Sequence, residues 1–274
     1  MKRNKKRILI YVCIVLLLGV LGYSLYRYLS IQKDYRDEKT AHNAVLRFQP
    51  SLPENGEPIL TDPDMPNSEA SAPGQSVDPG SDPENPAVCV PITNESILQL
   101  QAEYPDAVGW ITVPGTDVDY PFVQFQDNSY YLRRGIDGKY LYAGVPFLDY
   151  RCAADLSGGN SIIYGHNLRN GTMFGTLTRF KDRSFFDEHR YFYVFLAHDT
   201  IQAEIIACIV MTPDQVPYIY EPYPDDEFAS RCVADARCSL SGFTSSGSDR
   251  FITLSTCDYE KNNSRVILIG RIVE

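Results

Sequence analysis

The sequence has none of the closely spaced ligand pairs that hold structural metals. It contains no CxxC pair, and its four histidines are scattered along the 274 residues. Structural zinc sites need thiolate and imidazole ligands at short, regular spacings. We therefore expect neither a metal site nor a cofactor.

Basic residues are missing from a long part of the chain. Residues 48–132 contain no Lys or Arg, and the formal net charge of the whole chain is −10. Such a balance argues against a nucleic-acid partner. Residues 50–86 hold nine of the eighteen prolines, together with many Asp, Glu, Ser and Gly residues. This composition buries too little apolar surface to fold, so it predicts a disordered spacer over residues 48–88, a stalk that holds the domain away from the membrane.

Long uncharged runs are also missing, except at the N-terminus. Residues 8–25 carry no charge and follow five Lys and Arg residues. Eighteen residues span about 27 Å as a helix, which is enough to cross a bilayer. No small-x-small cleavage motif follows the run, which favours an anchor over a signal peptide. We predict a cytoplasmic tail (1–7), a single-pass membrane anchor (8–26) and a juxtamembrane helix (27–47), with the rest of the chain outside the cell.

The cysteine count restricts disulfides. Cys13 falls in the apolar run, and six cysteines follow it. If Cys257 must stay free, at most two disulfides can form among the other five.

The remaining residues, 89–274, have the composition of one globular catalytic domain. A helix is expected from Thr93 or Asn94 up to Pro105, and a second over residues 225–238. Eight β-prone runs, with helices only in the connections, predict a mostly β fold built as a closed or nearly closed barrel. They cover residues 108–113, 118–123, 140–148, 161–164, 191–196, 201–211, 251–255 and 266–272. The long connection 212–250 is a candidate for substrate selection.

A thiol site is indicated by three separated residues. Cys257 ends a β-prone run, where its sulfur can serve as a nucleophile. His166 follows Tyr164-Gly165 on an expected turn and can exchange protons with the thiol and the reacting amines. Arg265 begins the last strand, antiparallel to the one that ends in Cys257, and can stabilise an oxyanion or bind the substrate backbone.

Several alternatives remain open around this set. Arg271 competes with Arg265, and both a neutral Cys–His pair and a thiolate–imidazolium pair are compatible with the sequence. Asp258 is expected to point away from the sulfur, because a carboxylate there would disfavour a thiolate. Asn167, Tyr164, Ser255 and Thr256 are expected to line the site, bind substrate or position the two catalytic groups, with a packing role as the alternative. The order of histidine before cysteine excludes a papain-like protease.

Five segments resemble class B sortases, and the resemblance covers residues 95–274. They are Gly109-Trp110-Ile111, Asp127-Asn128-Ser129-Tyr130-Tyr131-Leu132, Ala143-Gly144-Val145-Pro146-Phe147-Leu148-Asp149, Tyr164-Gly165-His166-Asn167 with Met173-Phe174-Gly175, and Thr253-Leu254-Ser255-Thr256-Cys257.

The resemblance implies a cysteine transpeptidase on an eight-stranded β-barrel with peripheral helices, anchored on the outer surface of a Gram-positive cell. It would cleave surface proteins after the Thr of a C-terminal sorting signal of the Asn-Pro-x-Thr type or a related one. The thioester would pass to a peptidoglycan amine or, alternatively, to a pilin amine. A hydrolytic cysteine peptidase and a non-catalytic surface binding protein are the other hypotheses.

Overall fold

The computed structural model describes residues 2–52 and 93–273 of the chain. Most of the predicted spacer, from residue 53 to 88, lies outside the described residues, and so does Cys89.

Eight strands close a barrel within the described residues, as the sequence predicts. The order around it is β5-β1-β2-β3-β4-β8-β9-β6, and the pairing of β5 with β6 closes the ring. A ninth strand, β7, continues on the edge of β6 beyond β5. The strands are β1 (Ala107–Thr112), β2 (Asp119–Gln124), β3 (Phe147–Leu148), β4 (Asn160–Tyr164), β5 (Tyr191–Leu196), β6 (Asp199–Met211), β7 (Cys238–Ser239), β8 (Phe251–Cys257) and β9 (Arg265–Val273).

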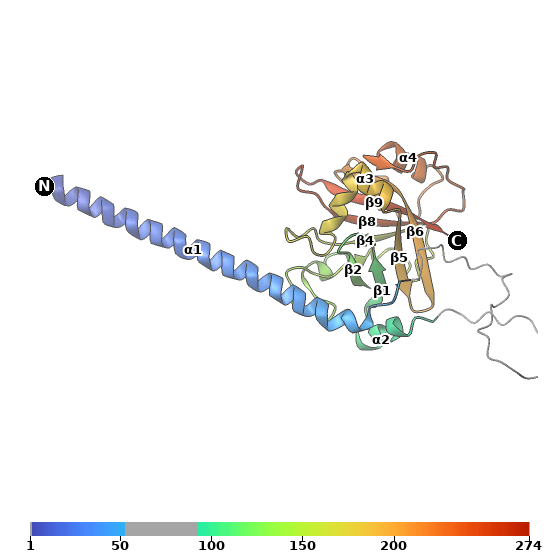
Figure 1. The fold of residues 1–274 in the computed structure, drawn as a ribbon, viewed down its shortest axis with the longest axis horizontal. Helices are drawn as coiled ribbons and strands as arrows, with labels where there is room; N and C mark the ends of the chain where they lie inside the picture. The colour runs from blue at the N-terminus through green and yellow to red at the C-terminus, as the bar shows by residue number, and fades with distance from the viewer. Residues whose placement is uncertain (1, 53–92, 274) are drawn as a thin grey trace, which may run out of the picture.

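Short helices fill the connections (Figure 1). Three are α-helices, namely α2 (Glu95–Glu103), α3 (Arg183–Glu188) and α4 (Phe228–Ala234). Four are 3₁₀ turns, namely η1 (Leu46–Phe48), η2 (Tyr130–Arg133), η3 (Gly175–Lys181) and η4 (Pro217–Tyr220). These counts refer to the described part of the chain.

Two sequence predictions of secondary structure are wrong. The predicted strand 140–148 is reduced to its last two residues in β3, because Gly144 turns the chain at φ +63 and leaves extended conformation. The predicted helix 225–238 is the shorter α4, and Cys238 lies instead on β7, where its backbone pairs with Cys208. The first error arises from this local turn, and the second arises because the conformation of Cys238 is set by pairing with a distant strand.

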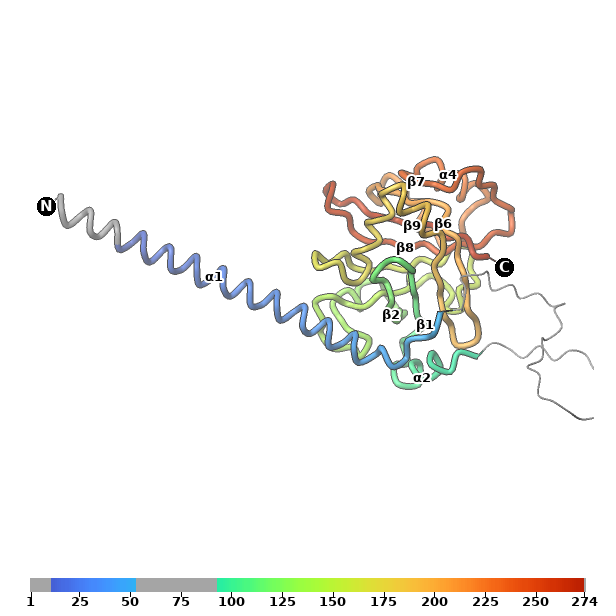
Figure 2. The backbone as a smooth tube through the Cα atoms, in the orientation of Figure 1, coloured from blue at the N-terminus to red at the C-terminus, as the bar shows by residue number. Residues whose placement is uncertain are grey.

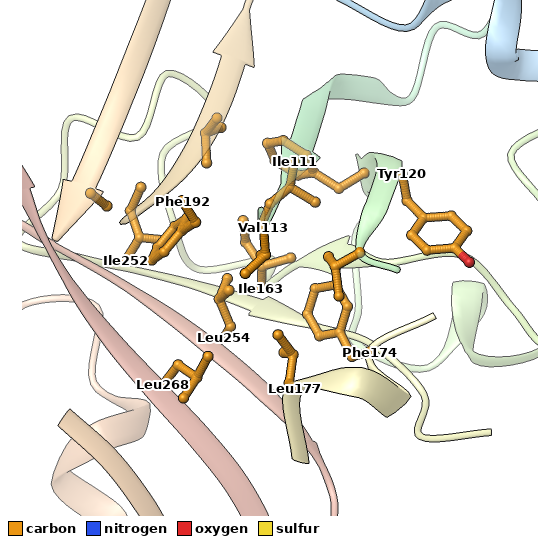
Figure 3. Close-up of a cluster of buried hydrophobic side chains, with 14 of the residues drawn as sticks. Ile111, Val113, Tyr120, Ile163, Phe174, Leu177, Phe192, Ile252, Leu254 and Leu268 are labelled. Carbon is orange, nitrogen blue, oxygen red and sulfur yellow. The ribbon is translucent and has the colours of Figure 1, made fainter. Parts of the chain in front are cut away.

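The core forms because residues alternate along the strands. On β8, Ile252 and Leu254 point into the main core, where they meet Ile163 and Leu268 of neighbouring strands (Figure 3). A strand sends successive side chains to opposite faces. Ser255 and Cys257 therefore project away from this core.

One helix, α1 (Lys2–Val45), runs from the N-terminus to the barrel (Figures 1 and 2). At 1.5 Å per residue it is about 66 Å long. It carries both the predicted anchor and most of the predicted juxtamembrane helix. Val45 and Phe48, at its end and in η1, are buried in a cluster with Trp110 of β1 and Ile97 of α2.

This packing shows that the predicted spacer begins with residues that contact the domain. Phe48, the first residue assigned to the spacer, lies in the domain core, and Arg47 forms an ion pair with Glu103 of α2. Past Phe48, the Gln49 side chain still donates a hydrogen bond to Asp119 of β2.

Candidate active site

The hairpin of β8 and β9 brings the predicted cysteine and arginine together. Cys257 is the register partner of Arg265. Side chains directly opposite in an antiparallel pair point to the same face, with Cβ atoms about 4.5 to 5.5 Å apart. The connection between them is closed by the Asp258 amide, which donates to the Ser264 carbonyl at 2.8 Å.

The predicted histidine reaches the same place from β4. Strand β4 runs parallel to β8, and Tyr164 is the register partner of Ser255. The pairing continues past the strand end, because the Gly165 amide donates to the Ser255 carbonyl at 3.1 Å and the Thr256 hydroxyl donates to the Gly165 carbonyl at 2.8 Å. His166 therefore leaves β4 beside the end of β8.

The tight path at Gly165 depends on the absence of a side chain. A Cβ at this position would lie 2.5 Å from the Phe174 ring. Phe174 is fully buried, and its amide donates to the His166 carbonyl at 2.9 Å. The segment around Phe174 thus fixes the backbone of the histidine.

A pocket of about 380 Å³ opens where these elements meet. Its wall is largely apolar and aromatic, with a few polar groups at the cysteine end, as is common for ligand sites. The thirteen lining residues are Asn128, Leu132, Val145, Phe147, Tyr164, Gly165, His166, Pro213, Tyr220, Ser255, Thr256, Cys257 and Arg265.

The surroundings of His166 favour a neutral imidazole. Its Nε2 lies 2.8 Å from the Leu132 carbonyl oxygen, which can only accept a hydrogen bond, so Nε2 carries the hydrogen and donates it. Burial lowers the pKa of His166 below its usual value, although the Leu132 bond opposes this. The other nitrogen, Nδ1, is then the basic one.

The comparisons with known proteins agree with this geometry. A family model described as the sortase domain matches residues 111–273. Sortase B of Listeria monocytogenes is 36% identical over 184 residues, 65% of this chain and 74% of its own.

Solved structures give the same result. A Staphylococcus aureus sortase B–substrate complex matches with a TM-score of 0.61 and 25% identity, over 66% of this chain and 86% of that one. A Streptococcus pyogenes class B sortase involved in pilus biogenesis matches with a TM-score of 0.59 and 32% identity, over 64% of this chain and 96% of that one.

The chain belongs to the class B sortases. Members of this family are cysteine transpeptidases. The sortase fold accounts for the eight-stranded barrel described above.

Of the two candidate arginines in this sortase, the barrel brings only Arg265 to the pocket. Its Nη1 donates to the carbonyls of Asn263 and Ser264 at 3.0 and 3.1 Å. Arg271 lies six residues farther along β9 and forms an ion pair with Glu204 at 2.7 Å. Its guanidinium therefore has a partner far from the thiol.

The four predicted site-lining residues separate into two groups. Tyr164, Ser255 and Thr256 line the sortase pocket. Asn167 does not belong to the lining; it is nearly buried, and its Nδ2 donates to the Cys257 carbonyl at 2.8 Å. This contact ties the histidine loop to the strand end, so we interpret Asn167 as a positioning residue.

Asp258 lies on the other side of the strand end. Its buried carboxylate accepts a hydrogen bond from Lys181 Nζ at 3.0 Å, and it borders a separate surface hollow that does not include Cys257. The expectation that it points away from the sulfur fits this position.

Sequence reasoning missed Tyr220, which belongs to η4 in the long connection after β6. Its ring is stacked on Tyr164 with centroids 6.2 Å apart, and its hydroxyl lies 3.2 Å from Ser255 Oγ. The sequence indicated the connection as a selection loop, but no motif distinguishes this tyrosine from its neighbours Tyr218 and Tyr223.

The other cysteines have environments unlike that of Cys257. All six cysteines in the described residues are free thiols, and Cys152, Cys208, Cys232 and Cys238 are buried. Burial raises the pKa of each of these four thiols. Across residues 2–52 and 93–273, no cluster of His, Cys, Asp or Glu could hold a metal ion.

Proposed function

We propose that Cys257 is the nucleophile of this sortase, His166 its general acid and base, and Arg265 its oxyanion-stabilising group. The observation that carries the proposal is the convergence of these three side chains on one pocket from β8, from the turn after β4 and from β9. The other described cysteines outside α1 are buried, which leaves Cys257 as the accessible thiol.

The chemistry follows from the protonation of His166. The neutral imidazole takes the thiol proton as the sulfur attacks the scissile carbonyl. The tetrahedral oxyanion forms opposite Arg265, whose guanidinium stays charged at neutral pH. The carbon–nitrogen bond breaks as the imidazolium protonates the leaving amine, and a thioester remains. An incoming amine attacks the thioester, His166 accepts its proton and the thiol is released.

The substrate is a surface protein with a C-terminal sorting signal, cleaved after Thr. The support comes from the similar Staphylococcus aureus sortase B, which has been solved as a complex with substrate. The apolar, aromatic wall of the pocket suits a short extended peptide. We infer that the acceptor is a peptidoglycan amine.

A pilin amine is the second candidate acceptor. The observation in its favour is the similarity to the Streptococcus pyogenes enzyme involved in pilus biogenesis. Offering the purified sortase a wall-derived amine and a pilin lysine peptide in parallel would separate the two, because the preferred acceptor should increase turnover at lower concentration.

The location we propose is the outer face of a cell membrane. Among the described residues, α1 is the one helix long and apolar enough to cross a bilayer. The basic residues before its apolar run favour a cytoplasmic N-terminus. The barrel, at the opposite end of α1, would then lie outside the cell.

Cleavage of a quenched fluorescent Asn-Pro-x-Thr peptide tests the enzyme assignment. We expect turnover by the wild type that stops in Cys257→Ala, and acceleration by hydroxylamine or a wall-derived amine. Turnover without acceleration would indicate a hydrolytic peptidase. If purified, folded wild type showed neither thiol-dependent cleavage nor thioester formation with any peptide of a sorting-signal library, a non-catalytic binding role would replace the proposal.

A further inference from the structure

A fully buried carboxylate lies directly behind the substrate pocket. Asp149 follows β3 and is completely inaccessible to solvent. Its Oδ1 accepts from the backbone N–H and from Nε of Arg151 at 3.0 and 2.9 Å. Its Oδ2 accepts from Arg151 Nη2 at 3.0 Å, Asn128 Nδ2 at 2.9 Å and the Tyr164 hydroxyl at 3.0 Å. One carboxylate thus takes five hydrogen bonds.

Two of these donors belong to the pocket wall. Asn128 and Tyr164 both line the pocket, and they come from segments thirty-six residues apart. Asp149 fixes the Asn128 amide group and the Tyr164 ring at the same point. The wall therefore depends on a buried charge that the substrate does not touch.

The third donor, Arg151, extends the hydrogen-bond network to the long connection after β6. Arg151 Nη2 also donates to the Tyr220 carbonyl at 2.7 Å. Asn160 Nδ2 donates to the carbonyls on either side, those of Ile219 and Glu221, at 2.9 and 3.2 Å. Three consecutive carbonyls of this segment are thus held by side chains of the barrel. Arg151 donates to the central carbonyl, that of Tyr220, and Asp149 in turn orients the Arg151 guanidinium.

The network ends close to the nucleophile. The Tyr164 ring, fixed by Asp149, stacks on Tyr220, whose hydroxyl meets Ser255 Oγ. Ser255 precedes Cys257 by two residues on β8, so both side chains lie on the same face of the strand. Tyr220 is thus held at its carbonyl, its ring face and its hydroxyl.

Fold stability alone does not account for such a carboxylate. Taking a charge out of water is unfavourable, and an apolar replacement of a buried ion pair is often equally stable. The unfavourable free energy of burying this carboxylate is explained if the charge fixes one arrangement of side chains. The pKa of Asp149 is lowered by its hydrogen bonds, above all those from Arg151, although burial opposes this.

We propose that Asp149 is a positioning residue that sets the shape of the sorting-signal pocket through Tyr164, Asn128 and the Arg151–Tyr220 contact. The inference rests on the proposed function in that it assigns the pocket to the donor peptide. It adds a determinant of substrate binding that lies outside the Cys257, His166 and Arg265 set.

The first test separates binding from chemistry. Asp149→Asn should raise KM for the quenched Asn-Pro-x-Thr peptide at least tenfold. The rate at which iodoacetamide alkylates Cys257 should stay within about twofold, because the thiol itself is untouched. Glu204→Gln is the matched control, since Glu204 is also a mostly buried carboxylate that pairs with two arginines, Arg190 and Arg271. An equal change of KM in both variants would overturn the proposal.

A second measurement does not depend on the substrate. Hydrogen exchange of the segment around Tyr220 should be at least threefold faster in Asp149→Asn than in wild type, and unchanged in Glu204→Gln. Unchanged exchange around Tyr220 in Asp149→Asn would contradict the network. If wild type failed to cleave any sorting peptide, the proposed function would fall, and the exchange result would still decide whether Asp149 holds this wall.

A third variant covers the case in which Asp149→Asn does not fold. Tyr164→Phe removes only the hydroxyl that donates to Asp149, and it should raise KM several-fold with the alkylation rate unchanged. Normal KM in folded Tyr164→Phe, with no folded Asp149 variant, would overturn the link between the carboxylate and the pocket.

Discussion

At the scale of single residues, the site depends on which groups already have partners. Arg271 is occupied by Glu204, and the buried cysteines are shielded from substrate. Within the described residues, the hydrogen bonds of the Arg265 guanidinium go to two carbonyls of its own turn, so its remaining donors can reach the pocket that it lines. His166 is held in one tautomer by the Leu132 carbonyl. Chemical type made these residues candidates, and their partners separate the residues proposed to act in catalysis from the rest.

Replacing Arg265 should slow the reaction without unfolding the protein. Loss of one oxyanion donor costs about 2.7 to 4 kcal/mol of barrier, so Arg265→Ala should reduce kcat by about a hundredfold to a thousandfold. Arg271→Ala is the control and should keep kcat within about twofold, because its partner Glu204 is remote from the thiol. Steady-state kinetics on both variants checks this. A larger loss in Arg271→Ala than in Arg265→Ala would reverse the assignment.

The acidic limb of kcat/KM should reflect the buried imidazole. As pH falls through the pKa of His166, the ring gains a proton and no longer accepts one from the thiol. Because burial places this pKa below the usual 6.5, activity should persist at pH values where an exposed histidine would be protonated. Measuring kcat/KM between about pH 4.5 and 8 gives the pH at which this acidic limb is centred. An acidic limb centred above 6.5 would show that the burial of His166 does not control it.

At the scale of elements, the pocket forms where the end of β8, the turn after β4 and the start of β9 meet. The turn after β4 is tied to β8 by the Gly165–Ser255, Thr256–Gly165 and Asn167–Cys257 hydrogen bonds. The β-prone pattern predicts that β4 and β8 exist. It does not give their parallel pairing, which depends on the closure of the whole barrel.

Adding a methyl group at Gly165 should disturb the turn after β4, where it packs beside β8. The new Cβ in Gly165→Ala would meet the buried Phe174 ring at 2.5 Å, and overpacking of this kind costs about 1 to 3 kcal/mol. Because His166 is the next residue, we expect kcat to fall at least tenfold. Gly247→Ala is the control, since a Cβ there has open space around it. Thermal unfolding and kinetics on both variants test this, and equal behaviour would contradict the expected clash.

At the scale of the whole molecule, α1 is part of the catalytic domain as well as a candidate anchor. Its Glu38 is nearly buried against the barrel and accepts a hydrogen bond from Asn170, four residues after His166. Val45 and Phe48 complete the cluster around Trp110. The helix that would cross the membrane thus contacts the histidine loop directly.

Removing the docked end of α1 should destabilise the domain. Phe48→Ala should lower the free energy of unfolding by about 3 to 5 kcal/mol, the usual cost of truncating a buried Phe. Leu46→Ala, at a neighbour that is 36% exposed, should cost less. Urea denaturation of a chain starting at Ser30 measures the free energy of unfolding of both variants. A chain starting at Cys89, which lacks the docked end of α1, should have a lower free energy of unfolding still. Equal stability of the Ser30 and Cys89 chains would show that α1 does not contribute to the domain.

The sequence alone determined the features that depend on local order. Alternating residues predict the strands, the uncharged run predicts a membrane-spanning helix, and the motifs at His166 and Cys257 identify the family. Such signals are carried by neighbours in the chain, so they can be recognised without coordinates.

Only the tertiary structure decided the features that depend on segments meeting at a distance. It separated Arg265 from Arg271, removed Asn167 from the pocket wall, attached the first residues of the predicted spacer to the domain and brought Tyr220 and Asp149 to the site. Strand register and side-chain packing fix these relations, and they arise from contacts between residues tens of positions apart. The proposed nucleophile was predictable because its motif is local, whereas the shape of its pocket was not, because that shape belongs to the folded barrel.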